Sequence, residues 1–209
     1  MSELLTRALT GAVLVAIVIL ATTYSFATSC ALWGVLGVIG VKEVYTNKMG
    51  GVLGMFLVLL AAVSTVSIGF LDILSSSLEY EGMNVVAFLT MIWANDTFAY
   101  LGGNFIGRKI ISKGLAPSVS PNKSWEGAFI GALAAAAVGW LWLFGVFGAV
   151  VGACIGIMAT SGDLFVSKAK RSAGVKDTGT LLPGHGGVLD RFDGLVLAAP
   201  LTFIIIFFI

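Results

Sequence analysis

The sequence WEGAFIGALAAAAVGWLWLFGVFGAVVGACIGIMATSGDLFVS, residues 125–167, decides what kind of fold this chain can adopt. It is mostly apolar, and its only charged residues are Glu126 near its start and Asp163 near its end. A helix crosses the hydrocarbon core of a bilayer with about 20 residues, and this run is roughly twice that length. We therefore predict two membrane-spanning helices joined by a tight hairpin at Gly145–Gly148, where the glycines permit a sharp turn.

The rest of the chain has the same character. Of its 209 residues, 58% are hydrophobic and 11% are charged, and the mean hydropathy is +1.01. Soluble domains carry roughly 25% charged residues, and the alternating ten-residue segments of a membrane barrel are absent. We predict an all-α polytopic membrane protein with about seven transmembrane helices, forming a single integral membrane domain over residues 1–209. The predicted spans are Leu4–Tyr24, Phe26–Val41, Val52–Phe70, Asn84–Gly102, Trp125–Phe144, Phe147–Ser167 and Phe192–Ile209.

The first two spans differ from the others. The first resembles a signal peptide, because Arg7 precedes an apolar run, but no A-x-A cleavage site follows and we expect the span to be retained. The second is short enough to be re-entrant. Cys30 and Cys154 lie in apolar segments, so we expect them to be buried small residues without a disulfide or a metal.

The distribution of charge predicts how the spans are oriented. With the N-terminus in the cytoplasm, seven spans place every basic residue on the cytoplasmic side. The longest outer loop then holds Asp72, Glu79 and Glu81 and no base. The twelve bases are Arg7, Lys42, Lys48, Arg108, Lys109, Lys113, Lys123, Lys168, Lys170, Arg171, Lys176 and Arg191.

Six acidic residues gather at the cytoplasmic ends of the predicted spans, whereas Glu3 and Glu43 appear peripheral in this arrangement. Charges inside a membrane usually face a cavity or a partner, so Asp96 and Asp163 are expected to line a polar pocket. The alternative without a binding function is that the acids only form ion pairs with neighbouring lysine and arginine at the membrane interface. The six are Asp96, Glu126, Asp163, Asp177, Asp190 and Asp193.

The polar loop 167–193 suits a site for a metal ion and a polyphosphate. Carboxylates such as Asp163 and Asp190 bind Mg²⁺ while water or substrate phosphate fills the rest of its shell. Lysine and arginine supply charge for phosphate oxygens, and glycines let the backbone approach them. His185, the only histidine in the sequence, lies in the loop between glycines. We expect neither Asp163 nor Asp190 to be kept for folding, because an unpaired buried carboxylate does not stabilise a protein.

A second polar loop, 102–125, ends in SPNKSWEG. This pattern predicts a turn followed by a helix start, with Ser124 as the cap and Glu126 in the first turn. A helix N-terminus beside Lys123 is a ready anion site. The alternative is an ordinary cytoplasmic loop with Trp125 at the membrane interface.

The stretch SKAKRSAGVKDTGTLLPGHGGVLDRFDG, residues 167–194, resembles the signature of the phosphatidate cytidylyltransferases, also called CDP-diacylglycerol synthases. The signature reads S-x-x-K-R, four residues, K-D, a short gap and L-P-x-H-G-G-x-x-D-R-x-D, and its strongly constrained positions are all matched. The segments SVSPNKSWEG and ANDTFAYLGGNFIGRK are similar to the same family. The chain looks like a short member, with N-terminal spans over 1–83 and a catalytic part over 84–209.

The resemblance implies that CTP and phosphatidic acid condense to CDP-diacylglycerol and pyrophosphate, in a nucleotidyl transfer assisted by Mg²⁺, alone or with a second cation. It implies metal coordination by Asp163 and Asp190. Catalytic roles would extend to Lys170, Arg171, Lys176 and His185. Substrate-binding roles would fall on Ser120, Lys123, Ser124, Arg191, Asp177, Asp193 and Asp96. The implied partners are CTP, phosphatidic acid, membrane lipid and a second copy of the chain, with no nucleic acid, at the inner cell membrane.

Besides a lipid-binding structural protein, which would not need the metal-type carboxylates, three other functions remain open at this point. One is a synthase that acts on an archaeal ether-lipid phosphate, and another is a CTP-dependent polyprenol kinase that releases CDP. The third is a transporter, which would place charges near the bilayer midplane and broken helices on both faces. The gathering of charge on one side disfavours the transporter.

Overall fold

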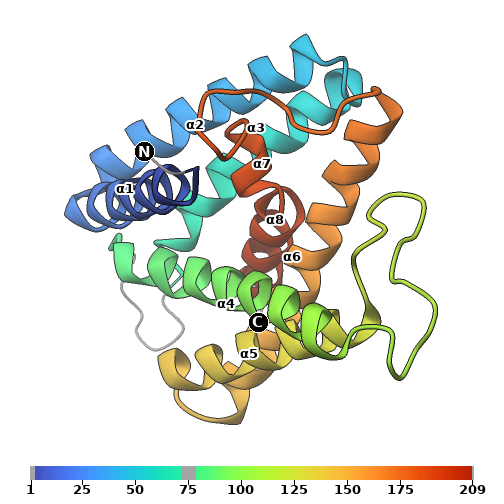
Figure 1. Ribbon diagram of the computed structural model, residues 1–209. Helices are drawn as coiled ribbons and strands as arrows, with labels where there is room; N and C mark the ends of the chain where they lie inside the picture. The colour runs from blue at the N-terminus through green and yellow to red at the C-terminus, as the bar shows by residue number, and fades with distance from the viewer. Residues whose placement is uncertain (1–2, 72–78, 209) are drawn as a thin grey trace. The chain divides into compact units, whose positions relative to one another are not determined.

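The computed structural model describes residues 3–71 and 79–208, and within them the fold is entirely helical apart from two isolated bridges between loop residues (Figure 1). The all-α membrane fold is therefore confirmed. Within the described part of the chain, six helices are long and apolar enough to span a membrane, and α8 is a shorter apolar helix. The helices are α1 Glu3–Tyr24, α2 Phe26–Thr46, α3 Gly51–Ile68, α4 Gly82–Ile106, α5 Trp125–Leu143, α6 Val146–Ser172, α7 Leu189–Phe192 and α8 Leu195–Phe207.

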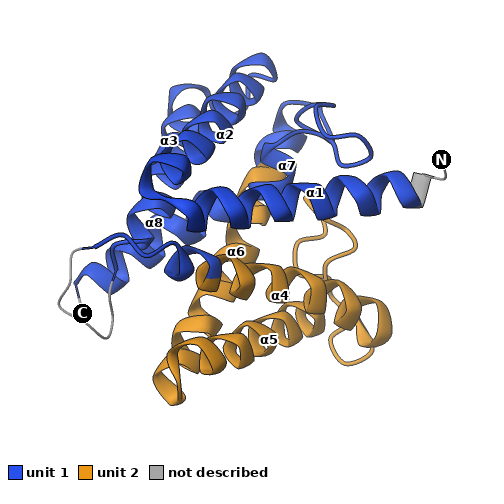
Figure 2. Ribbon diagram, turned by 90° about the vertical axis from the view of Figure 1, so that its left-hand side faces the viewer, with its two compact units in different colours: residues 1–86, 169–209 blue, residues 87–168 orange. Residues whose placement is uncertain are grey.

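The chain forms two compact units, drawn in blue and orange in Figure 2. The first comprises residues 1–86 and 169–209. In it, α2 packs against α1, α3 and the short α7, and α3 packs against α8. Small residues allow the close approach of α2 and α3, since a Cβ atom at Gly40 would come within 2.8 Å of Val58 Cγ1. The ring of Trp33 on α2 meets that of Phe192 at 5.6 Å in an edge-on contact.

The second unit, residues 87–168, contains most of α4, all of α5 and most of α6. The predicted hairpin is present, with its turn at Phe144 and Gly145, whose φ angles of 48° and 99° are left-handed. Glycines bring its two helices into backbone contact, because a Cβ atom at Gly139 would come 2.2 Å from Gly148 O. The amide of Asn95 on α4 donates to Thr160 Oγ1 on α6 at 3.1 Å. The hairpin prediction is confirmed.

Four predicted spans have clearly different lengths in the structure. Helices α4 and α6 end at Ile106 and Ser172, beyond the predicted ends at Gly102 and Ser167. Helix α2 continues five residues beyond the predicted end at Val41, because Glu43 has hydrogen-bond partners and its charge does not end the helix. Helix α8 begins at Leu195 and has 13 residues, so it is shorter than the predicted seventh span. Asp72 of the predicted outer loop lies outside the described residues.

Cys30 and Cys154 were predicted to be buried, and this is wrong. Both are exposed on the surfaces of apolar helices, and both are free thiols. An apolar sequence does not distinguish a residue facing the protein core from one facing lipid, because both surroundings are apolar. Their thiols therefore lie on helix surfaces that the membrane would cover.

Candidate active site

A buried ion pair joins the end of α6 to α7. Lys170 Nζ donates to Asp190 Oδ1 at 2.8 Å, and the two side chains are 9% and 2% exposed. Asp193 Oδ2 lies 3.8 Å from the same ammonium group. Three residues that the sequence singled out are thus brought together.

Asp190 also accepts hydrogen bonds from the loop that precedes it. Its Oδ2 atom accepts from Thr178 N at 2.7 Å and from Gly187 N at 2.9 Å, and Thr178 Oγ1 lies 3.1 Å away. Burial alone would raise the pKa of Asp190, but the bonds from Lys170 and the two backbone amides outweigh it, and the net pKa is lowered. Asp190 is therefore held as a carboxylate. It is paired as well as buried, so the expectation that folding does not depend on it no longer holds for this residue.

The loop that wraps Asp190 takes its shape from glycines. Gly184 and Gly186 have φ angles of 73° and 83°, which an L side chain rarely adopts. Between them, His185 N donates to Leu182 O at 2.8 Å and closes a turn. The His185 ring is half-buried and lies near Gly11 of α1. The N-terminal helix thus borders this loop, and its Arg7 lies against Gly184.

Glu43, which seemed peripheral in the sequence, is buried and contacts the same loop. Its Oε1 atom accepts from Val188 N at 2.8 Å, and its Oε2 atom accepts from Leu189 N at 2.9 Å and from the Thr178 hydroxyl at 2.6 Å. Asn47, one turn later, donates to Thr178 O at 2.7 Å. Sequence reasoning missed both residues. A carboxylate within the last turn of an apolar helix was the signal that could have identified Glu43.

A second ion pair lies within the other unit. Lys123 Nζ contacts Asp163 Oδ2, and Ser167 donates to Asp163 Oδ1 at 3.0 Å. The side chains of Lys123 and Asp163 are 28% and 30% exposed, so this pair is far more open to solvent than the pair of Lys170 and Asp190. The two pairs belong to different compact units, and a single metal site that combines Asp163 with Asp190 stays a prediction.

The start of α5 is built as the sequence predicted. Ser124 caps the helix by accepting from Gly127 N at 3.1 Å, and Glu126 lies in the first turn. Ser124 is buried, and a binding role for it stays a prediction. The carboxylate of Glu126 accepts from the backbone N–H groups of Arg108, Ile110 and Ile111 at 2.8–3.1 Å. Glu126 therefore anchors the start of the polar loop and is not available as a free charge.

The remaining candidates lie at the surface or in turns. Ser120 is half-buried in a turn, where its backbone N–H donates to Ala116 O at 2.9 Å. The guanidinium of Arg171 donates to Val175 O at 3.0 Å. The side chains that expose their charges are Asp96, Arg171, Lys176, Asp177 and Arg191. The exposed bases are thus placed where solvent and dissolved anions reach them.

The carboxylates of Asp163 and Asp190 have the donor chemistry that Mg²⁺ prefers. Among the described residues, no group of three or more His, Cys, Asp or Glu side chains could hold a metal ion. Mg²⁺ keeps part of its coordination shell for water and phosphate oxygens and can bind through one or two protein carboxylates. Binding of Mg²⁺ by Asp163 and Asp190 stays a prediction.

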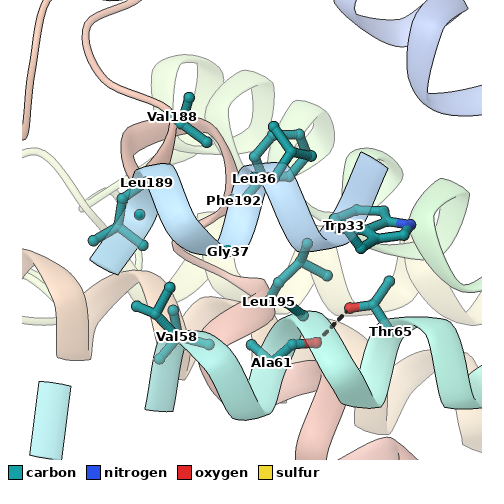
Figure 3. Close-up of a pocket in the computed structure, with 13 residues that line it drawn as sticks. Trp33, Leu36, Gly37, Val58, Ala61, Thr65, Val188, Leu189, Phe192 and Leu195 are labelled. Carbon is teal, nitrogen blue, oxygen red and sulfur yellow. Dashed lines mark hydrogen bonds between the residues drawn. The ribbon is translucent and has the colours of Figure 1, made fainter. Parts of the chain in front are cut away.

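An apolar cavity lies directly behind α7 in the first unit (Figure 3). Helices α2, α3, α7 and α8 line it, with Trp33 and Gly37 on one side and Val58 on another. Leu189 and Phe192, which lie on α7 with Asp190, are among the residues that line the cavity. The polar cluster around Asp190 therefore borders an apolar space inside the same unit.

Comparison with known proteins identifies the family. A model of the cytidylyltransferase family matches residues 5–209. The chain is 32% identical to a phosphatidate cytidylyltransferase of Rickettsia typhi over 211 residues, which cover 94% of this chain and 89% of that protein. A phosphatidate cytidylyltransferase of Rickettsia bellii is 33% identical over 72% of this chain and 69% of its own length. One of Brucella abortus is 43% identical over 60% of this chain and 48% of its own length. This chain belongs to the cytidylyltransferase family.

Proposed function

We propose that this protein is a phosphatidate cytidylyltransferase, an enzyme that converts CTP and phosphatidic acid into CDP-diacylglycerol and pyrophosphate. The observation that carries the proposal is the similarity, over nearly the whole chain, to a relative that bears this name. The buried Lys170–Asp190 pair within the signature loop supports it, because this loop gathers the charges that nucleotidyl transfer needs.

The chemistry requires little acid–base help. A phosphate oxygen of phosphatidic acid, already anionic, attacks the α-phosphorus of CTP and forms a new P–O bond. The bond from that phosphorus to the bridging oxygen of the β-phosphate breaks, and pyrophosphate leaves with the electron pair. The difficulty is the repulsion between two anionic substrates, which positive charges in the site must offset.

The basic side chains of the signature loop are suited to that task. Lys170 is held by Asp190 at 2.8 Å, and Arg171 and Lys176 are exposed beside it in sequence. A lysine supplies a point charge, whereas an arginine can bind two phosphate oxygens at once. We assign these three residues and Arg191 to phosphate contacts, and Lys123 with Ser120 to contacts from the second polar loop.

Asp163 and Asp190 are the residues that would hold Mg²⁺. When bound, the ion would supply positive charge to the triphosphate and the departing pyrophosphate. Asp177, Asp193 and His185 are assigned to shaping the loop, and Asp96 to a further polar contact.

Placement in a membrane suits the two substrates. The apolar helices make the chain an integral membrane protein, which gives access to lipid. We propose that the polar loops and the N-terminus face the cytoplasm, where CTP is found, since the predicted spans place all basic residues on one side. We further propose that two copies of the chain associate.

The test is a reaction with purified protein, CTP, Mg²⁺ and phosphatidic acid in detergent micelles. CDP-lipid and pyrophosphate should appear together in equal amounts. Label from the γ-phosphate of CTP should stay out of the lipid, and its transfer to a polyprenol would replace this proposal with a kinase. Activity on an archaeal ether-lipid phosphate, but not on phosphatidic acid, would change the substrate.

A further inference from the structure

We infer that Glu43 is a positioning residue for Asp190. It lies outside the signature stretch, 147 positions before Asp190 in the chain, yet its carboxylate accepts three hydrogen bonds from the loop that holds this residue. The inference rests on the proposed function for its activity measurements, and it names a residue that the signature does not contain.

The three donors to Glu43 belong to residues that adjoin Asp190 in the chain or donate to its carboxylate. Val188 N and Leu189 N belong to the two residues directly before Asp190. The third donor is the hydroxyl of Thr178, whose backbone N–H donates to Asp190 Oδ2 at 2.7 Å. Glu43 therefore holds the backbone directly before Asp190, at Val188 and Leu189. It also holds Thr178, whose N–H donates to the Asp190 carboxylate.

The Thr178 hydroxyl makes this coupling direct. Its oxygen lies 2.6 Å from Glu43 Oε2 and 3.1 Å from Asp190 Oδ2, and a hydroxyl has a single hydrogen to donate. The shorter contact assigns that hydrogen to Glu43. The Asp190 Oδ2 atom is then held by the backbone N–H groups of Thr178 and Gly187, and its Oδ1 atom is directed at Lys170.

The packing around Thr178 and Glu43 leaves no room for a side chain at position 187. A Cβ atom at Gly187 would come 2.2 Å from Thr178 Oγ1 and 2.6 Å from Glu43 Oε2. Asn47 adds a bond to Thr178 O from the next turn of α2. The end of α2 thus holds the loop through hydrogen bonds to residues 178, 188 and 189 and through close packing at Gly187. We infer that these contacts set the orientation of the Asp190 carboxylate.

The test compares Glu43→Gln with Thr178→Val, Thr178→Ser and a matched control, Glu81→Gln, at an exposed glutamate. Glutamine keeps the size of Glu43 but turns an NH₂ group toward a donor. Loss of a group that orients a metal ligand typically lowers metal affinity or activity by about 10–100-fold. We expect Glu43→Gln and Thr178→Val to lower kcat or to raise the Mg²⁺ concentration for half-maximal rate by this factor, with KM for phosphatidic acid unchanged. Thr178→Ser and Glu81→Gln should remain near wild type.

Amide hydrogen exchange supplies a readout without turnover. In Glu43→Gln, one carboxylate oxygen becomes an NH₂ group, so the amide of Val188 or that of Leu189 loses its acceptor. We also expect the amides of Thr178 and Gly187, which donate to Asp190, to exchange at least about tenfold faster. Faster exchange at Val188 or Leu189 alone, with kcat and the Mg²⁺ dependence unchanged, would show a purely structural role and overturn the inference.

Two further results separate the possible failures. If Glu43→Gln does not fold, the pair Thr178→Val and Thr178→Ser decides, and equal kcat values for the two would overturn the inference. If the wild-type protein makes no CDP-lipid, the proposed function fails, whereas exchange at Thr178 and Gly187 still decides whether Glu43 positions Asp190.

Discussion

Replacement of Asp190 by asparagine is expected to destabilise the protein as well as to inactivate it. Asparagine can still accept from Thr178 N and Gly187 N, but it cannot neutralise Lys170, whose side chain is 9% exposed. Removal of one partner of a buried ion pair costs about 3–5 kcal/mol, because the remaining charge is left uncompensated. Asp193 Oδ2 stays 3.8 Å from Lys170. We therefore expect the lower end of the range, about 3 kcal/mol.

A double-mutant cycle tests this reasoning. Methionine at position 170 keeps most of the lysine side chain and removes its charge, so Lys170→Met combined with Asp190→Asn no longer leaves a buried ammonium group without Asp190. We expect the double variant to be more stable than Asp190→Asn alone and to remain inactive. Unfolding in detergent micelles and turnover are measured on the same preparations. Wild-type stability of Asp190→Asn, or strictly additive effects in the cycle, would refute the argument that the buried pair is coupled.

Four other outcomes are expected. Asp163→Asn should lower kcat by about 10²–10³ but change the free energy of unfolding by less than about 1 kcal/mol, because its pair with Lys123 is partly solvated; turnover and denaturant unfolding check both. Ser124→Ala removes the cap of α5 and should cost about 1 kcal/mol in an unfolding measurement. The pKa of Asp190 lies below its ordinary 3.8, so the stability that its ionised form contributes is complete above about pH 4 and is lost as the pH falls further. Unfolding measured at a series of pH values should show this loss in the wild type and not in Asp190→Asn. With the native cysteines replaced, a cysteine at Glu79 should react with an impermeant maleimide from outside and one at Ser172 should not, and the reverse pattern would overturn the proposed orientation.

Much of the fold could be predicted from the sequence, because membrane-spanning helices depend on local composition. The hairpin of α5 and α6 follows from an apolar run too long for one span and from the glycines in its middle. The cap at Ser124 follows from a four-residue pattern that needs no distant contact. The pair of Lys170 and Asp190 joins two residues of one signature stretch, so the motif already placed them close together.

What could not be predicted depends on contacts between distant segments. The position of Glu43 is decided by the loop near residue 188, which local patterning of α2 does not describe. The same contacts carry α2 beyond Val41, because a carboxylate with three donors no longer ends an apolar helix. The sequence also could not show whether Cys30 and Cys154 face lipid or the protein interior, because both surroundings are apolar.

The two buried glutamates, Glu43 and Glu126, have a consequence for how the enzyme could be redesigned. Each holds the backbone of a polar loop through main-chain N–H groups, and a backbone bond does not depend on which side chain the donor residue carries. Three exposed bases take no part in the hydrogen bonds of Glu43 and Glu126: Arg171, Lys176 and Arg191. Under the proposed phosphate contacts, replacement of these three bases would alter the preference for a nucleotide or a lipid headgroup and would leave in place the backbone hydrogen bonds that Glu43 and Glu126 accept.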